Sequence, residues 1–136
     1  MGVTVEQVAR VPAENIHVSR AAFGQVWAYA HDVATRPGPD NDYLVGVLWT
    51  CEWLARQPIW SQVLRKSEVP ASPVTRRHYA AMPETIQDEF IAAARACRPG
   101  RSGMLAELAR GTLAALEWAW HGSGRPPLEL PATAPR

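Results

Sequence analysis

The sequence predicts an all-α fold, a small helical bundle of about four main helices with short helical turns and an extended, proline-rich C-terminal tail. Four long segments place apolar residues at the three- and four-residue spacing of an amphipathic helix. No segment shows sustained strand alternation, and no hairpin dipeptide lies between two apolar runs. The length of 136 residues suits one domain. We therefore assign residues 1–122 to a single helical domain and residues 123–136 to the tail.

The composition is that of a folded globular protein with almost no net charge. Apolar residues make up 47% of the chain and the net charge is +1, which gives no bulk field for nucleic acid or an anionic membrane. Cys51 and Cys97 are too few for a disulfide framework. Residues 43–55 are too short for a membrane span, and the first residues lack a secretory pattern. We expect a cytoplasmic protein with no membrane partner. Lys66 is the only lysine among 14 basic residues, a bias typical of GC-rich bacterial genomes.

The first predicted helices are one short turn and one long helix. Residues 3–10 suit a short helical turn, which Pro12 closes. Residues 18–36 suit a longer helix, with Ser19 as its N-cap. Its inward face carries Ala22, Phe23, Val26, Trp27, Tyr29, Ala30 and Val33.

Residues 41–57 form the most apolar long stretch and predict a central helix. Asp40 or Asn41 caps its start and Pro58 ends it. Its length would be about 25 Å. One face holds Leu44, Val47, Leu48, Cys51, Leu54 and Ala55, and another holds Val45, Trp49 and Trp53. A helix that is apolar on two faces is usually enclosed by its neighbours.

The second half of the chain predicts one short helix and two long ones. Residues 59–66 suit a short amphipathic helix, and residues 68–75, with two prolines, suit a surface loop. Pro83 suits the first position of a helix that ends at about residue 97. Residues 103–121 predict the last helix, which Gly122 caps.

Two stretches of the chain echo each other. Residues 46–53, GVLWTCEW, and residues 111–118, GTLAALEW, share glycine, leucine, glutamate and tryptophan at the same offsets. Each follows an Arg-Pro-Gly turn, at residues 36–38 and 98–100. A duplicated helical hairpin would place these two helices around an approximate two-fold axis. Chance similarity in a chain of this composition is the alternative.

Six tryptophans are many for this length and favour a protein–protein interaction module. Trp49 and Trp120 suit the core, where a large aromatic side chain buries about 150–250 Å². Trp53 and Trp118 lie towards the flanks of their helices, and Trp60 follows a helix break. These three are candidates for an exposed partner surface. Such an adaptor, inhibitor or accessory subunit would bind another protein or a second copy of itself.

Two further segments are candidates for partner contacts. Arg76 and Arg77 form, with His78, the densest basic cluster, and suit either a solvated basic edge or an acidic protein partner. Nucleic-acid contact is the weaker alternative, because no recognised DNA-binding motif is present. Leu128 and Leu130 in the tail suit an extended segment that anchors in a groove.

The alternative function is a small-molecule-binding or enzymatic bundle. The side chains assigned to this site are Trp49, Glu52, Glu117 and His121, in a cleft that Trp53 and Trp118 also line. Each glutamate has a basic residue four positions on, Arg56 or His121, so ion pairs along each helix are the simpler interpretation. A glutamate held among tryptophans would instead have a raised pKa and suit general acid or base chemistry.

The sequence contains no complete catalytic or metal-binding motif. It has no His-Glu-x-x-His pair, no Cys-x-x-Cys pair and no glycine-rich phosphate loop. We therefore predict no catalytic residues, no metal and no cofactor.

Overall fold

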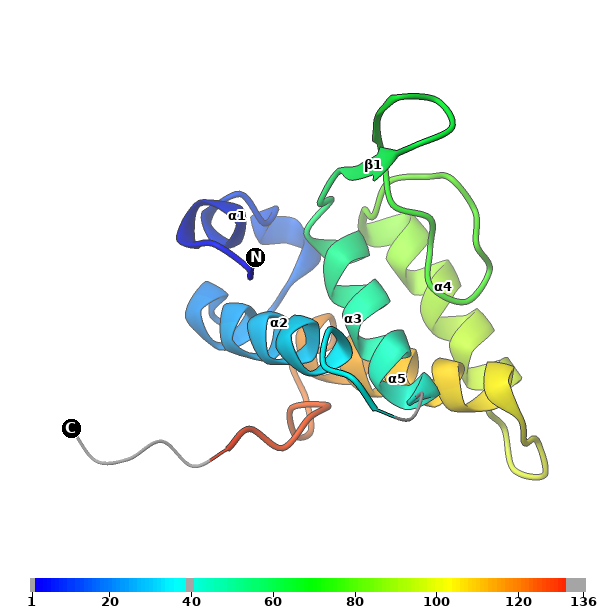
Figure 1. Cartoon of the computed structure of the whole chain (residues 1–136). Helices are drawn as coiled ribbons and strands as arrows, with labels where there is room; N and C mark the ends of the chain where they lie inside the picture. Colours follow the sequence, from blue (N-terminus) through cyan, green and yellow to red (C-terminus); the bar gives the residue numbers. More distant parts are fainter. Residues whose placement is uncertain (1, 39–40, 132–136) are drawn as a thin grey trace.

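The computed structural model describes residues 2–38 and 41–131. The described residues form five α-helices, one 3-10 turn and one two-stranded hairpin (Figure 1). In chain order these are α1 (Val5–Ala9), η1 (Ala13–Asn15), α2 (Arg20–Ala34), α3 (Asp42–Leu54), β1 (Ile59–Ser61), β2 (Lys66–Glu68), α4 (Pro83–Ala96) and α5 (Met104–Ala119). The mostly helical fold is confirmed, but the hairpin means that it is not strictly all-α.

The helix starts follow the local signals in the sequence. The Ser19 hydroxyl accepts a hydrogen bond from the Ala22 N–H at 3.0 Å, and α2 begins directly after it. Asn41 caps α3 in the same way, because its Oδ1 accepts from the Leu44 N–H at 3.0 Å. Pro83 is the first residue of α4. These three predicted helix starts are confirmed.

Helices α3 and α5 form the centre of the molecule. They share the largest interface, with α2 packed on α3 and α4 packed on α5. Figure 1 shows α3 crossing in front of α5, with α2 and α4 on either side. The largest fully buried side chains include Phe23, Trp27, Val47, Trp53, Leu54, Ile86 and Leu116. The central position predicted for residues 41–57 is thus shared with α5.

Two glycines allow α3 and α5 to touch backbone to backbone. A Cβ atom on Gly46 would lie 2.1 Å from the carbonyl oxygen of Leu108, and one on Gly111 would lie 2.1 Å from that of Tyr43. The contact is reciprocal, because Leu108 precedes Gly111 by three residues and Tyr43 precedes Gly46 by three. We call this contact the glycine crossing. No side chain larger than hydrogen fits there.

Burial along the two central helices follows the same reciprocity. Residues 44–54 of α3 and 109–119 of α5 can be aligned on their crossing glycines. Equivalent positions in these ranges share the same degree of burial except at one pair, because Glu52 is half-buried and Glu117 is exposed. The environment of Glu52 is therefore where the two central helices differ.

The predicted helix at residues 59–66 is wrong, because this segment forms the β1–β2 hairpin. Ile59 pairs with Glu68 and Ser61 with Lys66 in antiparallel register. Arg65 closes the turn with a φ of 54°, and its N–H donates to the Ser61 carbonyl at 2.8 Å. A helix of this length is marginal unless its apolar face is buried. Isoleucine and tryptophan side by side favour a strand.

The start of the tail contacts the helical core. The Tyr43 hydroxyl donates to the Pro127 carbonyl at 2.7 Å. Leu128 and Leu130 are half-buried and pack against the core cluster. The remainder of the predicted tail, residues 132–136, lies outside the described residues. Within the described ranges, no helix has the length and apolarity needed to cross a membrane.

Candidate functional site

The structure separates the three tryptophans that were predicted to form a partner surface. The exposed fraction is 0% for Trp53 and 7% for Trp118, so their predicted surface position is wrong. Each lies seven residues after its crossing glycine, which is two helical turns, so both continue the buried face of the glycine crossing. The indole N–H of Trp53 donates to the Tyr79 carbonyl at 3.0 Å. Trp60 is 54% exposed, on strand β1.

Exposed apolar side chains gather on the hairpin and the residue that follows it. We call this set the hairpin surface, which consists of Ile59, Trp60, Val63, Leu64 and Val69. They are five of the ten large apolar residues that are exposed in the described part of the chain. Figure 1 shows the hairpin projecting from one end of the helical body. This concentration is the feature expected of a protein-binding surface.

Basic side chains border the hairpin surface. Arg65 and Lys66 lie in the hairpin itself, and Glu68 is its only acidic residue. His78, from the following loop, lies beside β2 and shares a shallow depression with Lys66 and Val69. Arg77, one of the predicted partner contacts, is exposed on the same loop. The rim of the hairpin surface is therefore net positive.

Arg76 is positioned by a stacking contact with α3. Its guanidinium carbon lies 4.2 Å from the centre of the Trp49 ring, and its backbone has a φ of 56°. A contact of this kind is worth about 0.5–1 kcal/mol at an exposed site. Trp49, expected in the core, is half-buried beneath the arginine. The two side chains come from the two alternative predicted sites, and the structure places them in contact.

A buried glutamate that the sequence analysis missed holds this loop in place. Glu89 of α4 is fully buried and accepts hydrogen bonds from the N–H of Val74 at 2.5 Å and of Thr75 at 2.9 Å. The Thr75 hydroxyl donates to the other carboxylate oxygen of Glu89 at 2.7 Å. The position of Glu89 in the sequence could have indicated its burial, because it lies three residues after Ile86 on the inward face of α4. A carboxylate in such a stripe needs internal donors.

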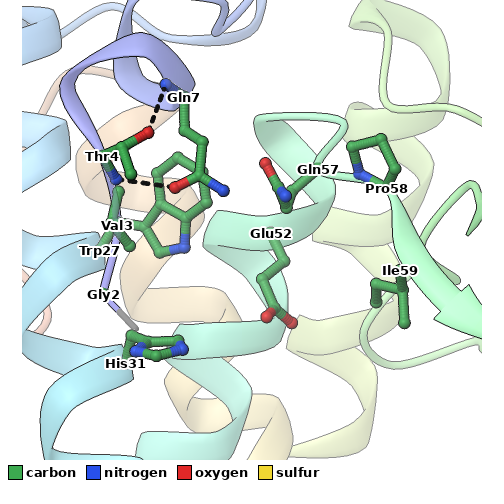
Figure 2. A pocket seen from close by; sticks show the side chains of 10 residues that line it. All are labelled: Gly2, Val3, Thr4, Gln7, Trp27, His31, Glu52, Gln57, Pro58 and Ile59. Atoms are coloured by element: carbon green, nitrogen blue, oxygen red, sulfur yellow. Dashed lines mark hydrogen bonds between the residues drawn. The ribbon is translucent and has the colours of Figure 1, made fainter.

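Glu52 lines a cavity between the N-terminal segment, α2, α3 and the start of the hairpin (Figure 2). We call it the Glu52 cavity, and its volume is about 430 Å³. Figure 2 shows the Glu52 carboxylate, the His31 ring and the indole nitrogen of Trp27 directed toward the same space. Val3 and Ile59 provide apolar wall on opposite sides. The tryptophan here is Trp27, which the sequence analysis placed only in the core.

The unfavourable effect of burial on the Glu52 carboxylate is only partly offset by a nearby positive charge. Burial raises its pKa, and the Arg76 guanidinium lowers it by a smaller amount. Arg56, the predicted partner four residues on, instead donates its Nε–H to the Ala81 carbonyl at 2.9 Å. Its guanidinium lies 3.8 Å from the Glu14 carboxylate. The helical ion pair expected for Glu52 is therefore replaced by contacts of Arg56 with other segments.

The chain matches no protein-family model, no curated protein and no solved structure.

Glu117 and His121 do not join Glu52. Glu117 is exposed on α5 and does not line the Glu52 cavity. The His121 ring packs on Phe90, with their centres 4.4 Å apart. The predicted shared cleft of the two glutamates is therefore wrong, because Glu52 lines the cavity while Glu117 is exposed on α5.

The Cys51 thiol and the metal-ligating side chains do not form a further reactive site in the described residues. Cys51 is fully buried in α3, and burial together with the neighbouring Glu52 charge raises the pKa of its thiol. A thiol that resists ionisation is a poor nucleophile. Across the described residues, no three metal-ligating side chains of His, Cys, Asp or Glu gather at one place.

Proposed function

We propose that the protein is a protein–protein interaction module, which binds an acidic partner through the hairpin surface. The observation that carries the proposal is the clustering of Ile59, Trp60, Val63, Leu64 and Val69 on one projecting hairpin. Tryptophan is one of the side chains that most often dominate the binding energy of an interface when a partner pocket desolvates them. An adaptor, an inhibitor and an accessory subunit all fit this description.

The charge around the hairpin favours an acidic partner over a second copy of the chain. Arg65 and Lys66 flank the apolar residues, and His78 lies beside β2. A symmetric dimer through this surface would bring two net-positive rims together, which is unfavourable. A partner pocket edged by aspartate or glutamate would instead gain complementary contacts and faster association. The partner is therefore an acidic protein surface with an apolar pocket for Trp60.

The hairpin surface contributes little to the fold, which makes the proposal testable by substitution. Val63 is 90% exposed and Leu64 is 55% exposed. Substitutions at such positions usually change stability by less than about 0.5 kcal/mol. A loss of binding in a Trp60→Ser, Leu64→Ser variant would therefore report on the interface.

The experiment is native co-purification with mass spectrometry, followed by affinity measurement with the purified partner. The partner should bind the wild type and bind the Trp60→Ser, Leu64→Ser variant at least about tenfold more weakly. Its affinity should also fall as salt is raised, because the rim charges are screened.

Leu105→Ser is the matched control for this experiment. Leu105 is 58% exposed, close to the 55% of Leu64, but lies on α5 far along the chain from the hairpin. It should keep full affinity. The proposal fails if the hairpin variant retains every wild-type partner, or if the only associated species in analytical ultracentrifugation is a second copy of the chain.

We also propose that α2–α3 and α4–α5 are two copies of one helical hairpin. The reciprocal contacts of Gly46 and Gly111 support this, as does the matching burial of residues 44–54 and 109–119 outside one glutamate pair. Superposing one pair of helices on the other should require a rotation near two-fold. A rotation far from two-fold would leave the sequence echo as coincidence.

A further inference from the structure

The Glu52 cavity shares Ile59 with the hairpin surface but none of its other residues, and its chemistry points to a different kind of ligand. We propose that it binds a small organic cation, a primary ammonium group on an apolar body, with Glu52 as the counter-ion. Three features of the described residues support this: a break in symmetry, a charge that is only partly compensated, and the composition of the walls.

The difference in burial between Glu52 and its equivalent Glu117 suggests that Glu52 has a role other than stabilising the fold. Glu52 and Glu117 occupy equivalent places, six residues after their crossing glycines. Glu117 is exposed to water, which is the ordinary state of a helical glutamate. Glu52 is instead partly buried against a cavity, although its position in the helix pair is the same. The fold therefore does not require a glutamate to be buried at this position.

The Glu52 carboxylate is half-buried, and among the described residues it has no hydrogen bond or close ion pair of its own. Its helical neighbour Arg56 contacts Ala81 and Glu14. Arg76 acts on it only from a position stacked over Trp49, and the effect of burial is the larger of the two. Buried charges in proteins are normally paired or coordinated. A bound ammonium group would supply the missing counter-charge and up to three hydrogen-bond donors.

The cavity walls define the rest of the ligand. Val3 and Ile59 offer apolar surface for a hydrocarbon or aromatic body. The indole nitrogen of Trp27 and the His31 ring face the space beside the carboxylate, so they can orient a polar end. The volume of about 430 Å³ lies within the range of small-molecule sites, about 300–1,000 Å³. An anionic ligand would face the Glu52 charge and is disfavoured.

Benzylamine is a suitable probe, because it joins a primary ammonium to an aromatic body. Benzyl alcohol, nearly the same shape without the charge, is the reference compound. Each is titrated into ¹⁵N-labelled protein, and the indole N–H resonance of Trp27 is followed by NMR after assignment with Trp27→Phe. We expect benzylamine to shift this resonance with saturation, and benzyl alcohol to bind at least about tenfold more weakly.

Glu52→Gln and Glu117→Gln are the matched pair of variants. Glu52→Gln keeps the shape of the side chain and should weaken benzylamine binding at least about tenfold. Glu117→Gln, at the equivalent exposed position, should bind as the wild type does. The Trp60→Ser, Leu64→Ser variant should also bind normally, which separates this proposal from the partner surface.

Several outcomes would overturn the cation site. Equal affinity of the wild type and Glu52→Gln would do so, and so would equal affinity for benzylamine and benzyl alcohol. The same holds if no Trp27 shift occurs with benzylamine up to about 10 mM, well above a millimolar Kd. Folding of Glu52→Gln is checked by its NMR spectrum and thermal midpoint, so a lost signal cannot be mistaken for lost binding.

Discussion

Glu52 is a residue whose charge opposes folding, and the opposition depends on pH. Below the ordinary glutamate pKa of 4.5, the carboxyl is protonated in the folded and the unfolded chain alike. As pH rises, the unfolded chain releases the proton first, so the folded state loses stability until pH passes the raised pKa. Arg76, the His31 ring and the neighbouring Cys51 thiol are charged or titratable groups close to this carboxyl.

Glu52→Gln should therefore be more stable than the wild type at pH 7, and the difference should disappear below pH 4.5. The measurement is urea unfolding of both proteins across this pH range. Glu117→Gln is the control and should show no such pH-dependent gain, because its carboxylate is exposed. A Glu52→Gln protein that is less stable at pH 7 would show that the carboxylate is better compensated than its contacts indicate.

Glu89 is the opposite case, a buried carboxylate whose partners are complete. Glu89→Gln removes the charge and replaces one acceptor with an NH2 donor, which faces the Thr75 hydroxyl when the amide oxygen accepts from the N–H groups of Val74 and Thr75. We expect a loss of about 2–4 kcal/mol in unfolding free energy. Asp88→Asn, at an exposed neighbouring position of α4, should change it by less than about 0.5 kcal/mol. Similar stability of the two variants in urea unfolding would contradict this role.

Local chemistry explains which residue-level predictions succeeded. Ser19, Asn41 and Pro83 act within their own helical turn, so their roles follow from neighbouring sequence alone. Trp53 and Glu52 depend on which segments cover each side of α3. That information lies in the pairing of helices far apart in the chain, and the pattern along one helix does not contain it.

At the scale of elements, the glycine crossing sets the distance between α3 and α5. Gly46→Ala or Gly111→Ala would place a Cβ atom 2.1 Å from a carbonyl oxygen, so the helices must separate. We expect each to lower the unfolding free energy by at least about 2 kcal/mol, despite the better helix propensity of alanine.

Gly24→Ala provides the comparison for the crossing glycines. A Cβ atom on Gly24 would meet only the Val8 side chain of α1, at 2.9 Å, and a short helix can shift. Its effect in thermal or urea unfolding should be clearly smaller than that of either crossing glycine. If all three alanine variants unfold alike, the backbone contact does not define the interface.

The hairpin shows why one element was assigned the wrong type. Trp60, Val63 and Leu64 have the spacing of an amphipathic helix, but no neighbouring element covers them. Without tertiary burial, the strand preference of Ile59 and Trp60 and the turn at Arg65 prevail. Predicting a helix from the spacing of apolar residues assumes that their shared face is buried, and here these residues are exposed to solvent.

At the scale of the whole molecule, stability should be concentrated at the centre. Native-state hydrogen exchange should be slowest in α3 and α5, which share the largest interface. It should be fastest in the β1–β2 hairpin, which has two short strands and exposed side chains. Exchange in the hairpin that is as slow as in α3 would show that it is part of the cooperative core.

The overall architecture could be predicted further than its functional surface. Four long helical patterns were enough to predict a mostly helical fold, while the duplication suggested by the internal echo stays a prediction. The cavity was not predictable, because it is formed by the N-terminal segment, α2 and α3 together. The loop held by Glu89 was equally hidden, because its donors lie 14 and 15 residues away along the chain.

The two cysteines differ in burial, so the opening of the central helix can be followed by the rate of thiol labelling. Cys51 is buried in α3 beside Glu52, while Cys97 is half-buried at the end of α4. An alkylating reagent can reach Cys51 only when the central helix opens, so its labelling rate measures that opening. A cation bound at Glu52 favours the closed state and should slow the labelling of Cys51 while leaving Cys97 unchanged. Occupancy of the Glu52 cavity can thus be timed by the modification of a side chain that no ligand touches.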